Sequence, residues 1–347
     1  MSLAPKPERS PRVLVIRREN IGDLVCTTPL IRALRAQLPD AHIAALASDY
    51  SAAVLAGNPD VDKVHVYTKG KHRAPGVGPI GIYARRLALI LKLHRERFDW
   101  ILLPGGPHAS ALRFARWIGG RHVLVRGPQD AAGGPHEVEQ CCHLLVRMGL
   151  LYDAPPTRLS ADPAAAQEIE ARVAAHWAVR PRRLIGMHIS ARKPSQRWPV
   201  ASFAKLAQAL HGEGDVGLML LWAPGGGEDR LHPGDDDKAG DLMAEVPDVP
   251  VLPVATHRLD ELVAAISLCD ELICSDGGAM HLAAALEKPV VCLFGQSDAA
   301  HWRPWGVPFE LLQKASRDVA SIEVPEVVGA WRRLRAPERP RAAPQAS

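Results

Sequence analysis

The segment that begins at Asp276 has the composition of an anion-binding turn. An apolar run ends at Ser275, and Asp276, Gly277 and Gly278 follow it directly. A strand, a glycine turn and a helix start place free backbone N–H groups and a positive dipole end at one spot, which suits a phosphate group. His281 adds a candidate cation beside that spot. The alternative is an ordinary strand-to-helix turn in which Asp276 caps the helix.

Asp23 is the second candidate for chemistry, because it follows the apolar run Val13 to Ile16 after a short turn. A carboxylate at the end of a strand can accept a proton from an attacking hydroxyl group. The alternative is a plain N-cap. The start of the next helix stays open, since Thr28 and Pro29 suit an N-cap and first helical position. Asp23 equally suits the cap of a longer helix that Pro29 bends.

Two loops of the second half carry further polar residues behind expected strands. Residues 190–197, SARKPSQR, follow the expected strand Leu184 to His188, and residues 225–230 follow Val216 to Trp222. Neither loop matches a dinucleotide or P-loop fingerprint. Asp235 to Asp237 is interpreted as part of a solvated loop, since consecutive carboxylates rarely converge on one ion. No metal site is therefore predicted.

A basic segment lies between the expected strands at residues 61–67 and 100–103. It runs through a stretch rich in glycine and proline into an expected helix from Tyr83 to Phe98. A solvated helix face would explain these charges. The sharper hypothesis is a surface for an anionic partner, made by Lys69, Lys71, Arg73, Arg85 and Arg86.

The elements that position these loops alternate between strand and helix in both halves of the 347-residue chain. This alternation predicts two α/β domains with parallel sheets. Ligands of such sheets bind beyond the carboxyl ends of the strands, so the cleft between the domains is the expected site. Prolines near residue 160 mark the boundary. We expect domains at 1–160 and 161–335, and a disordered tail at 336–347.

The composition argues against several classes of protein. The net charge of +4 is only mildly basic and does not imply nucleic acid. The 6 cysteines form no C-x-x-C pair, which argues against a zinc ribbon or a disulfide framework and fits a cytosolic protein with reduced thiols. No signal peptide is predicted before Val13. No run approaches the ~18 apolar residues of a membrane span.

Three stretches of the chain resemble glycosyltransferase family nine, which contains the ADP-heptose:lipopolysaccharide heptosyltransferases. They are RVLVIRRENIGDLVCTTPLIRAL, RWPVASFAKLA and SDGGAMHLAAALEKPVVCLFGQSD, in this order. The resemblance spans residues 12–335, and its most specific part is the D-[ST]-G-x-x-H-L-x-A-A-L-x-[KR]-P pattern. It implies a GT-B fold, in which two Rossmann-like domains face each other across a cleft. It also implies an inverting, metal-independent sugar transfer without a cofactor.

The same resemblance implies the partners of the protein. The donor would be a nucleotide sugar, in the first place ADP-heptose. The acceptor would be a lipopolysaccharide core or lipid A-type molecule, reached by a cytoplasmic enzyme that is peripheral to the inner face of the cytoplasmic membrane. No nucleic acid is expected. A non-catalytic nucleotide-sugar binding protein and a GT-B epimerase are the alternatives.

Residue by residue, the resemblance implies a base on one side of the cleft and a donor site on the other. Asp23 matches the aspartate of the family's I-G-D motif, which is held to be the general base. Ser190 matches a hydroxyl residue near the donor phosphates, and Glu228 an acidic residue that holds the ribose. The loop that binds the donor sugar and diphosphate corresponds to Asp276, Gly277, Gly278 and His281.

Two positions depart from the family pattern and bear on the donor. Gln196 stands where heptosyltransferases usually carry a lysine, and Gly277 replaces the usual serine or threonine. Lys193, Arg192 or Arg197 could supply the charge that Gln196 lacks. We therefore count Lys193, Gln196 and Arg197 among the candidate donor-binding residues.

Overall fold

The computed structural model describes residues 10–67, 79–227 and 234–335. The elements of the first half are β1 (Arg12–Ile16), α1 (Ile21–Val25), α2 (Thr28–Gln37), β2 (His42–Ser48), η1 (Ala52–Leu55), β3 (Lys63–Tyr67), α3 (Pro79–Arg95), β4 (Trp100–Leu103), α4 (Ala109–Ile118), β5 (His122–Val125), η3 (Pro128–Gly133), α5 (Glu137–Cys142) and α6 (Leu144–Arg147).

The second half begins after an extended segment at residues 150–162. Its elements are α7 (Pro163–His176), β6 (Arg183–His188), η4 (Pro194–Gln196), α8 (Val200–His211), β7 (Val216–Trp222), α9 (Asp236–Glu245), β8 (Val251–Ala255), α10 (Leu259–Leu268), β9 (Glu271–Ser275), α11 (Gly278–Ala285), β10 (Val290–Phe294), α12 (Ala299–Trp302), β11 (Phe309–Gln313), η5 (Val319–Ser321) and α13 (Val324–Arg335).

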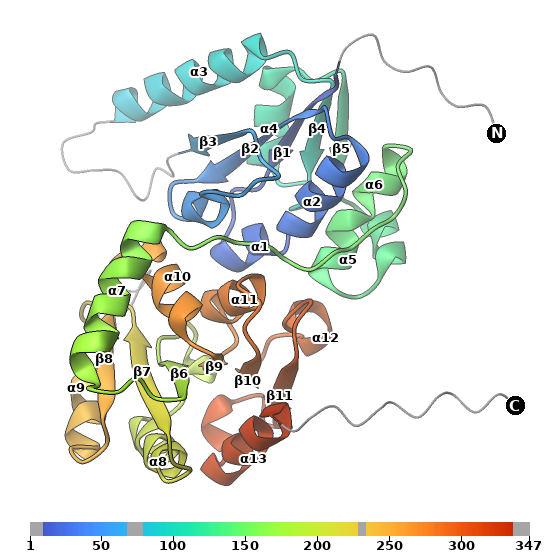
Figure 1. Cartoon of the computed structure of the whole chain (residues 1–347). Coiled ribbons are helices and arrows are strands. Elements are labelled where there is room, and N and C mark those ends of the chain that lie inside the picture. Colours follow the sequence, from blue (N-terminus) through green and yellow to red (C-terminus); the bar gives the residue numbers. More distant parts are fainter. Residues whose placement is uncertain (1–9, 68–78, 228–233, 336–347) are drawn as a thin grey trace, which may run out of the picture.

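Two parallel sheets, one in each half, form the framework (Figure 1). The first sheet has the order β3-β2-β1-β4-β5 and the second the order β11-β10-β9-β6-β7-β8. All neighbouring strands run parallel. The prediction of two Rossmann-like α/β sheets is confirmed. The chain order reverses between β1 and β4 in the first sheet and between β6 and β9 in the second, which are the points where such sheets bind ligands.

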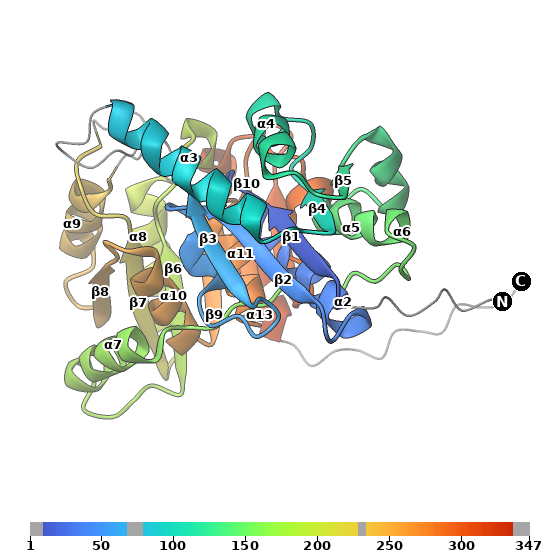
Figure 2. The ribbon, with the colours of Figure 1, turned by 90° about the horizontal axis from the view of Figure 1, so that it is seen from above.

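Helices cover both faces of each sheet, and the alternation along β1 shows how. Val13 and Val15 enter a core that α2, α5, α10 and α11 share, so it runs through both halves of the chain. Leu14 and Ile16 point to the opposite face and pack under α3 and α4. Successive side chains of a strand face opposite sides of its sheet. Figures 1 and 2 show α3 on the side of the first sheet that faces away from the second half.

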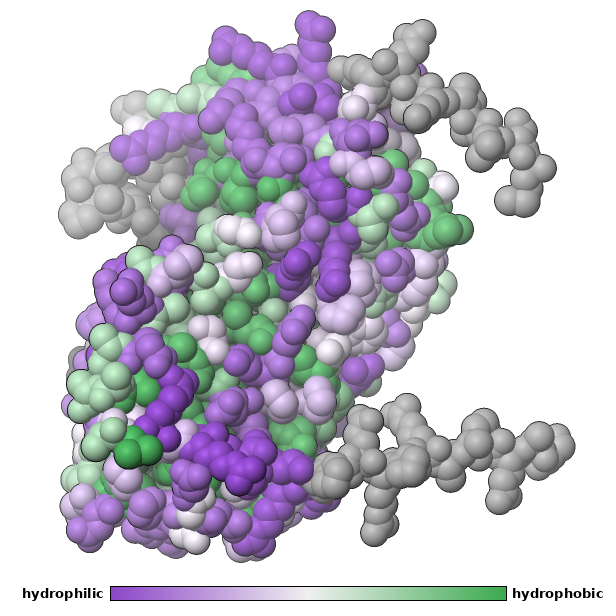
Figure 3. Space-filling view, in the orientation of Figure 1, coloured by the Kyte–Doolittle hydropathy of each residue, from purple (hydrophilic) through white to green (hydrophobic). Residues whose placement is uncertain are grey.

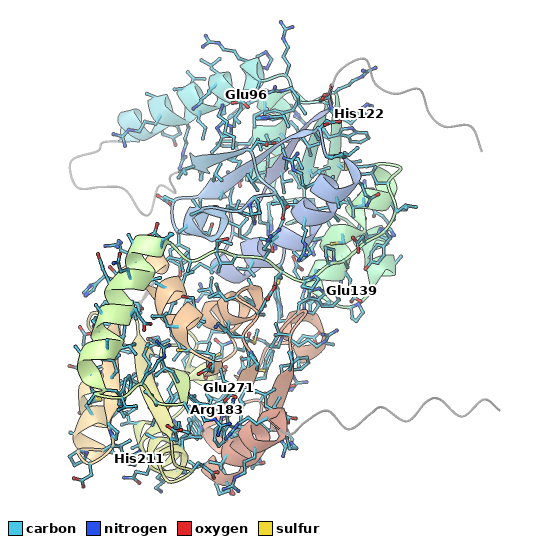
Figure 4. The ribbon with its side chains drawn as sticks, viewed as in Figure 1. Glu96, His122, Glu139, Arg183, His211 and Glu271 are labelled. Atoms are coloured by element: carbon cyan, nitrogen blue, oxygen red, sulfur yellow. The ribbon has the colours of Figure 1, made fainter. Side chains whose placement is uncertain are left out.

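The last helix is fastened to the second sheet by buried polar contacts. Trp331 of α13 donates its indole N–H to the carboxylate of Glu271, which also pairs with Arg183 at 2.7 Å. Figure 4 shows Glu271 and Arg183 side by side.

All 6 cysteines are buried and free.

Some of the expected elements have to be corrected. The acidic run at 235–237 is not a loop, because the buried Asp235 occupies the N-cap position and α9 starts at Asp236, although Asp236 and Asp237 are exposed as expected. The carboxylate of Asp236 accepts hydrogen bonds from Trp222 Nε1 and from the backbone N–H of Gly225. Strands β8 and β11 were not predicted. The amphipathic pattern of residues 136–148 predicts a single helix, but the structure divides this segment into α5 and α6.

Candidate active site

Asp23 lies in α1, directly beyond the carboxyl end of β1. Its carboxylate accepts hydrogen bonds from Arg17 Nη2 at 2.8 Å, from the Asn20 backbone N–H at 2.9 Å and from Asn20 Nδ2 at 2.8 Å. Asn20 is the N-cap of α1, and Asp23 is the third helical residue of its capping box. The plain N-cap alternative for Asp23 is therefore wrong. Thr27, rather than Thr28, occupies the N-cap position of α2, and its hydroxyl group donates to the Asp23 carbonyl oxygen.

Arg17 joins Asp23 to a buried group of charges. The Arg17 guanidinium is 2% exposed and contacts the carboxylates of Asp23, Glu137 at 2.7 Å and Glu19 at 3.3 Å. Burial alone would lower the pKa of Arg17, but the surrounding negative charges raise it above its ordinary value. The side chain that fixes Asp23 is therefore a permanent cation.

Glu137, at the start of α5, forms ion pairs with basic side chains from both halves of the chain. Besides Arg17, it accepts hydrogen bonds from Arg126 Nη1 at 2.6 Å, and His301 of α12 lies 2.8 Å away. Burial would raise the pKa of Glu137, but the contacts with His301, Arg17 and Arg126 hold it well below its usual range. The other ring nitrogen of His301 lies 2.7 Å from the Pro135 carbonyl oxygen. Both ring nitrogens thus face acceptors, which is the geometry of a protonated imidazole.

Helix α11 of the second half packs directly on α1. A Cβ atom placed on Gly22 would lie 2.6 Å from Cδ2 of His281, so no larger residue fits here without movement of the ring. Gly278, the first residue of α11, faces the side chain of Ile21. The I-G-D turn and the glycine turn that follows β9 are therefore neighbours in space. The start of α11, with its free N–H groups, therefore lies next to α1.

His281 is buried at this junction, and its environment corrects the expectation of a cation. Burial lowers the pKa of His281, although the charges of Asp276, Asp23 and Glu137 act in the opposite direction. Its Nδ1 atom lies 3.6 Å from the thiol of Cys26. The net lowering of the pKa, which comes from burial, favours a neutral imidazole at neutral pH.

Asp276 does not cap α11, because the N-cap position belongs to Gly277. The Asp276 carboxylate instead accepts a hydrogen bond of 2.6 Å from Gln196 Nε2, which also lies 3.3 Å from Ser297 Oγ. Gln196 is thus the partner of Asp276 at the position where the family pattern has a lysine. A neutral amide stands here in place of an ammonium group.

The other predicted donor residues surround the carboxyl end of β6. The Ser190 hydroxyl oxygen accepts a hydrogen bond from the backbone N–H of Ala223 at 2.9 Å, which leaves its own proton available. Lys193 is exposed, and Arg197 Nε donates to the Ala191 carbonyl oxygen at 2.9 Å. Ser190 and Asp276 follow β6 and β9, the two strands of the switch point. Glu228 lies outside the described residues.

Lys238 is a cation in this region that sequence reasoning missed. It lies on α9 and donates to the Ile189 carbonyl oxygen at 2.9 Å. Burial lowers its pKa to about 8, the charge of Arg197 acts in the same direction, and Asp235 acts against both. Its helix begins with an acidic run that favours a loop, so sequence patterns carry no signal for Lys238.

The predicted acceptor residues are only partly described. Lys69, Lys71 and Arg73 lie outside the described residues. Arg85 is exposed on α3, whereas the Arg86 guanidinium lies over the Tyr67 ring, 4.9 Å from its centroid. Among the described residues, no group of three or more His, Cys, Asp or Glu side chains is arranged to hold a metal ion.

Comparison with known proteins agrees with this geometry. Residues 87–324 match the family model of glycosyltransferase family 9 (heptosyltransferase). The chain belongs to this family. It is 27% identical to lipopolysaccharide heptosyltransferase 2 of Salmonella typhimurium over 300 residues, which cover 82% of this chain and 83% of that protein. A glycosyltransferase role follows from this membership.

Solved structures of family 9 proteins share the fold. The glycosyl transferase family 9 protein of Veillonella parvula has a TM-score of 0.80 and 18% identity, with 96% of this chain and 98% of that one covered. The ADP-heptose lps heptosyltransferase II of E. coli has a TM-score of 0.72 and 20% identity, with 93% and 98% covered. This family 9 enzyme therefore has the GT-B arrangement that the resemblance implied.

The contact between His301 and Glu137 predicts a pH-dependent stability. The hydrogen bond to Glu137 raises the pKa of His301, while its partial burial and Arg126 act against it. A raised folded-state pKa contributes stability that is complete below the unfolded pKa of ~6.5 and is lost as the pH rises through the folded value. We expect the difference in unfolding free energy between wild type and His301→Gln to be largest below about pH 6 and to shrink above it.

Denaturant unfolding over a range of pH measures this difference. His211→Gln, at an exposed position on α8, is the control for the replacement of a histidine by glutamine. A destabilisation by His301→Gln that stays constant or grows with pH would contradict a protonated His301.

Proposed function

We propose that this family 9 enzyme transfers a heptose from ADP-heptose to a lipopolysaccharide core or related lipid A-type acceptor, with inversion and without a metal ion. The observation that carries the proposal is the contact of α1 with α11, which sets Asp23 beside a helix start suited to a diphosphate. The similar E. coli protein is an ADP-heptose lps heptosyltransferase, which supports the donor.

In the proposed reaction, Asp23 is the general base. An acceptor hydroxyl group attacks the anomeric carbon and gives its proton to the Asp23 carboxylate, while the bond to the ADP oxygen breaks on the opposite side. Attack opposite the leaving group inverts the anomeric centre. Arg17 and Asn20 fix the carboxylate from behind, so it does not have to be reoriented during the reaction.

The leaving diphosphate gains negative charge as the bond breaks. The backbone N–H groups of Gly277 and Gly278 and the dipole of α11 would stabilise this charge. We assign the wider donor site to residues at the carboxyl edge of the second sheet. They are Ser190, Lys193, Gln196, Arg197, Glu228, Asp276, Gly277, Gly278 and His281.

The acceptor would bind on the first half, at Lys69, Lys71, Arg73, Arg85 and Arg86. Helix α3 supports an approach to a lipid surface, because its described outer side exposes Tyr83, Leu87 and Leu91 at successive turns, between 47% and 68% accessible. Arg85 and Lys92 are exposed beside them, and residues 79–95 contain no acid. Figure 3 shows hydrophobic and hydrophilic surface interleaved at this end. We propose that α3 rests on the inner face of the cytoplasmic membrane.

No helix in the described parts of the chain has the length and apolarity needed to cross a bilayer. Attachment at the surface through α3 would need both its apolar stripe and its charge.

Vesicle binding tests the role of α3. The wild type is expected to co-sediment with vesicles that contain anionic lipid, and Leu87→Ser/Leu91→Ser to bind about tenfold more weakly because less apolar surface enters the interface. Leu151→Ser/Val179→Ser, at two highly exposed apolar positions elsewhere, is the matched control. Equal binding of both double variants would count against α3.

Metal independence has a simple check. Turnover is expected to survive dialysis against EDTA, because helix N–H groups and basic side chains would balance the diphosphate charge. ADP release is measured before and after chelation. A loss of activity that added Mg²⁺ restores would refute this part of the proposal.

The transfer itself is tested by calorimetric titration with ADP-heptose and other nucleotide sugars, together with acceptor-dependent ADP release. Tight binding of ADP-heptose and ADP release only with a lipopolysaccharide acceptor would support the proposal. Donor binding without release would favour a nucleotide-sugar binding protein, the alternative to which Gln196 and Gly277 give some weight. Conversion of the donor sugar to an epimer without acceptor would indicate an epimerase.

A further inference from the structure

A pocket lies in the first half of the chain, next to the turn that follows β1. Its volume is about 310 Å³, and it is lined by Arg18, Glu19, Tyr67, His108 and Ser110. Arg18 and Glu19 follow β1, and Tyr67 is the last residue of β3. His108 and Ser110 lie at the start of α4, so the pocket lies beyond the carboxyl edge of the first sheet. The residues after β1 and β4 mark the switch point of this sheet, as Ser190 and Asp276 mark that of the second. The first sheet thus has its own position for a ligand.

Arg18 gives this pocket a buried positive charge. The residue is 6% exposed, its Nη2 atom donates to Ser110 Oγ at 3.0 Å, and its guanidinium lies over the rings of Tyr67 and Phe114. Within the described part of the chain, its buried Nε atom has no hydrogen-bond partner. A buried cation held by rings and a hydroxyl group retains capacity to bind an anion.

The nearest acid does not cancel this charge. The Glu19 carboxylate contacts Arg17 Nε at 3.3 Å and accepts the backbone N–H of Arg18 at 2.9 Å. Arg86 lies over the same Tyr67 ring, 4.9 Å from its centroid. Two guanidinium groups at one ring repel each other, and an anion bound at Arg18 would reduce the repulsion.

The remaining lining groups suit a sugar. His108 and Ser110 offer an imidazole and a hydroxyl group at the start of the ten-residue helix α4, whose dipole also favours an anion. Tyr67 adds an aromatic ring with a hydroxyl group. The volume is at the lower end of the range for small-molecule pockets, which fits one sugar unit with its charged substituent.

We propose that this pocket binds the anionic substituent, a carboxylate or a phosphate, of an acceptor sugar close to the reacting hydroxyl group. Glu19 lines the pocket and contacts Arg17, which holds Asp23, so the pocket is linked to the base through these two side chains. The role as acceptor site rests on the proposed transfer reaction. The binding of an anionic sugar does not, because it needs neither donor nor turnover.

Direct binding of small probes tests the pocket. Saturation-transfer NMR would compare methyl glucuronide, glucose 6-phosphate and the neutral methyl glucoside. We expect one or both anionic probes to bind and the neutral probe to bind at least about tenfold more weakly. Signal from the carboxylate alone or from the phosphate alone identifies the source of the charge. Absence of binding by both anionic probes, or equal binding of the neutral probe, overturns the proposal.

Arg18→Met is the principal variant and should weaken anion binding at least about tenfold while the affinity for ADP stays unchanged. Arg86→Met, at a partly exposed position, removes the second cation with less risk to folding and should weaken binding in the same direction. Arg116→Met, exposed on α4, is the matched control. Unchanged anion binding in Arg18→Met and Arg86→Met overturns the assignment.

The proposed pocket and the proposed transfer reaction can be refuted independently of each other. Anion binding that depends on Arg18 without any acceptor-dependent ADP release would leave the pocket assigned and refute the transfer reaction. Transfer to a lipopolysaccharide acceptor with an unchanged acceptor KM in Arg18→Met would leave the function standing and refute this pocket as its acceptor site.

Discussion

Asp23→Asn is expected to lower turnover by about 10²-fold or more while the affinity for the donor changes little. An amide cannot take the proton of the acceptor hydroxyl group, whereas the donor is assigned to the other half of the chain. The partners of the carboxylate, Arg17 and Asn20, both donate hydrogen bonds, so an amide N–H₂ group would also face one of them. Steady-state ADP release and calorimetric donor binding separate the two effects.

Controls distinguish the loss of a base from a local distortion. Asp162→Asn changes an N-cap carboxylate of α7 outside the candidate site and is expected to keep normal turnover. Asn20→Ala removes one partner of Asp23 but keeps the carboxylate, so it should cost far less activity than Asp23→Asn. Full activity in Asp23→Asn would end the assignment of Asp23 as the base.

Glu137→Gln is expected to lower the free energy of unfolding by about 3 kcal/mol or more. Glu137 is almost fully buried and accepts contacts from Arg17, Arg126 and His301 at 2.6–2.8 Å. A neutral amide would leave these cations without their shared carboxylate. Because the pKa of Glu137 is depressed, its contribution is present above the unfolded value of ~4.3 and is lost as the pH falls through the folded value.

Urea unfolding at neutral pH measures this change. Glu139→Gln on the same helix is the matched control, because glutamine can replace glutamate in the capping box with His136 and should cost at most ~1 kcal/mol. A similar, small loss in both variants would show that the charge cluster contributes little.

The framework could be predicted from hydrophobic patterns because most strands are buried on both faces. The expected strands at residues 100–103 and at Val216 to Trp222 agree with the bounds of β4 and β7. Strand β8 could not be predicted from its pattern because it contains Pro253, a residue that is unfavourable in strands. Strand β11 could not be predicted because it lies at the edge of its sheet and is only partly buried. Helix α9 begins with a polar run of aspartates, and such a run favours the prediction of a loop.

The candidate site could be predicted only where chain neighbours share a motif. Asp23, Gly278 and His281 belong to local patterns, and the structure brings them to one junction. Arg17, Glu137 and His301 come from distant parts of the chain, and their meeting depends on how the two halves pack. The same holds for the pocket at Arg18, whose walls come from three separate segments of the first half.

The contact between Gly22 and His281 has an evolutionary consequence. Gly22 is not among the glycines with a positive φ, so its own backbone does not demand glycine. Glycine is required at position 22 because the ring of His281 occupies the space that a Cβ atom would need. His281 lies in the other half, 259 positions along the chain. Substitutions at the two positions should therefore be coupled among related sequences. A side chain at position 22 becomes acceptable where position 281 has lost its ring.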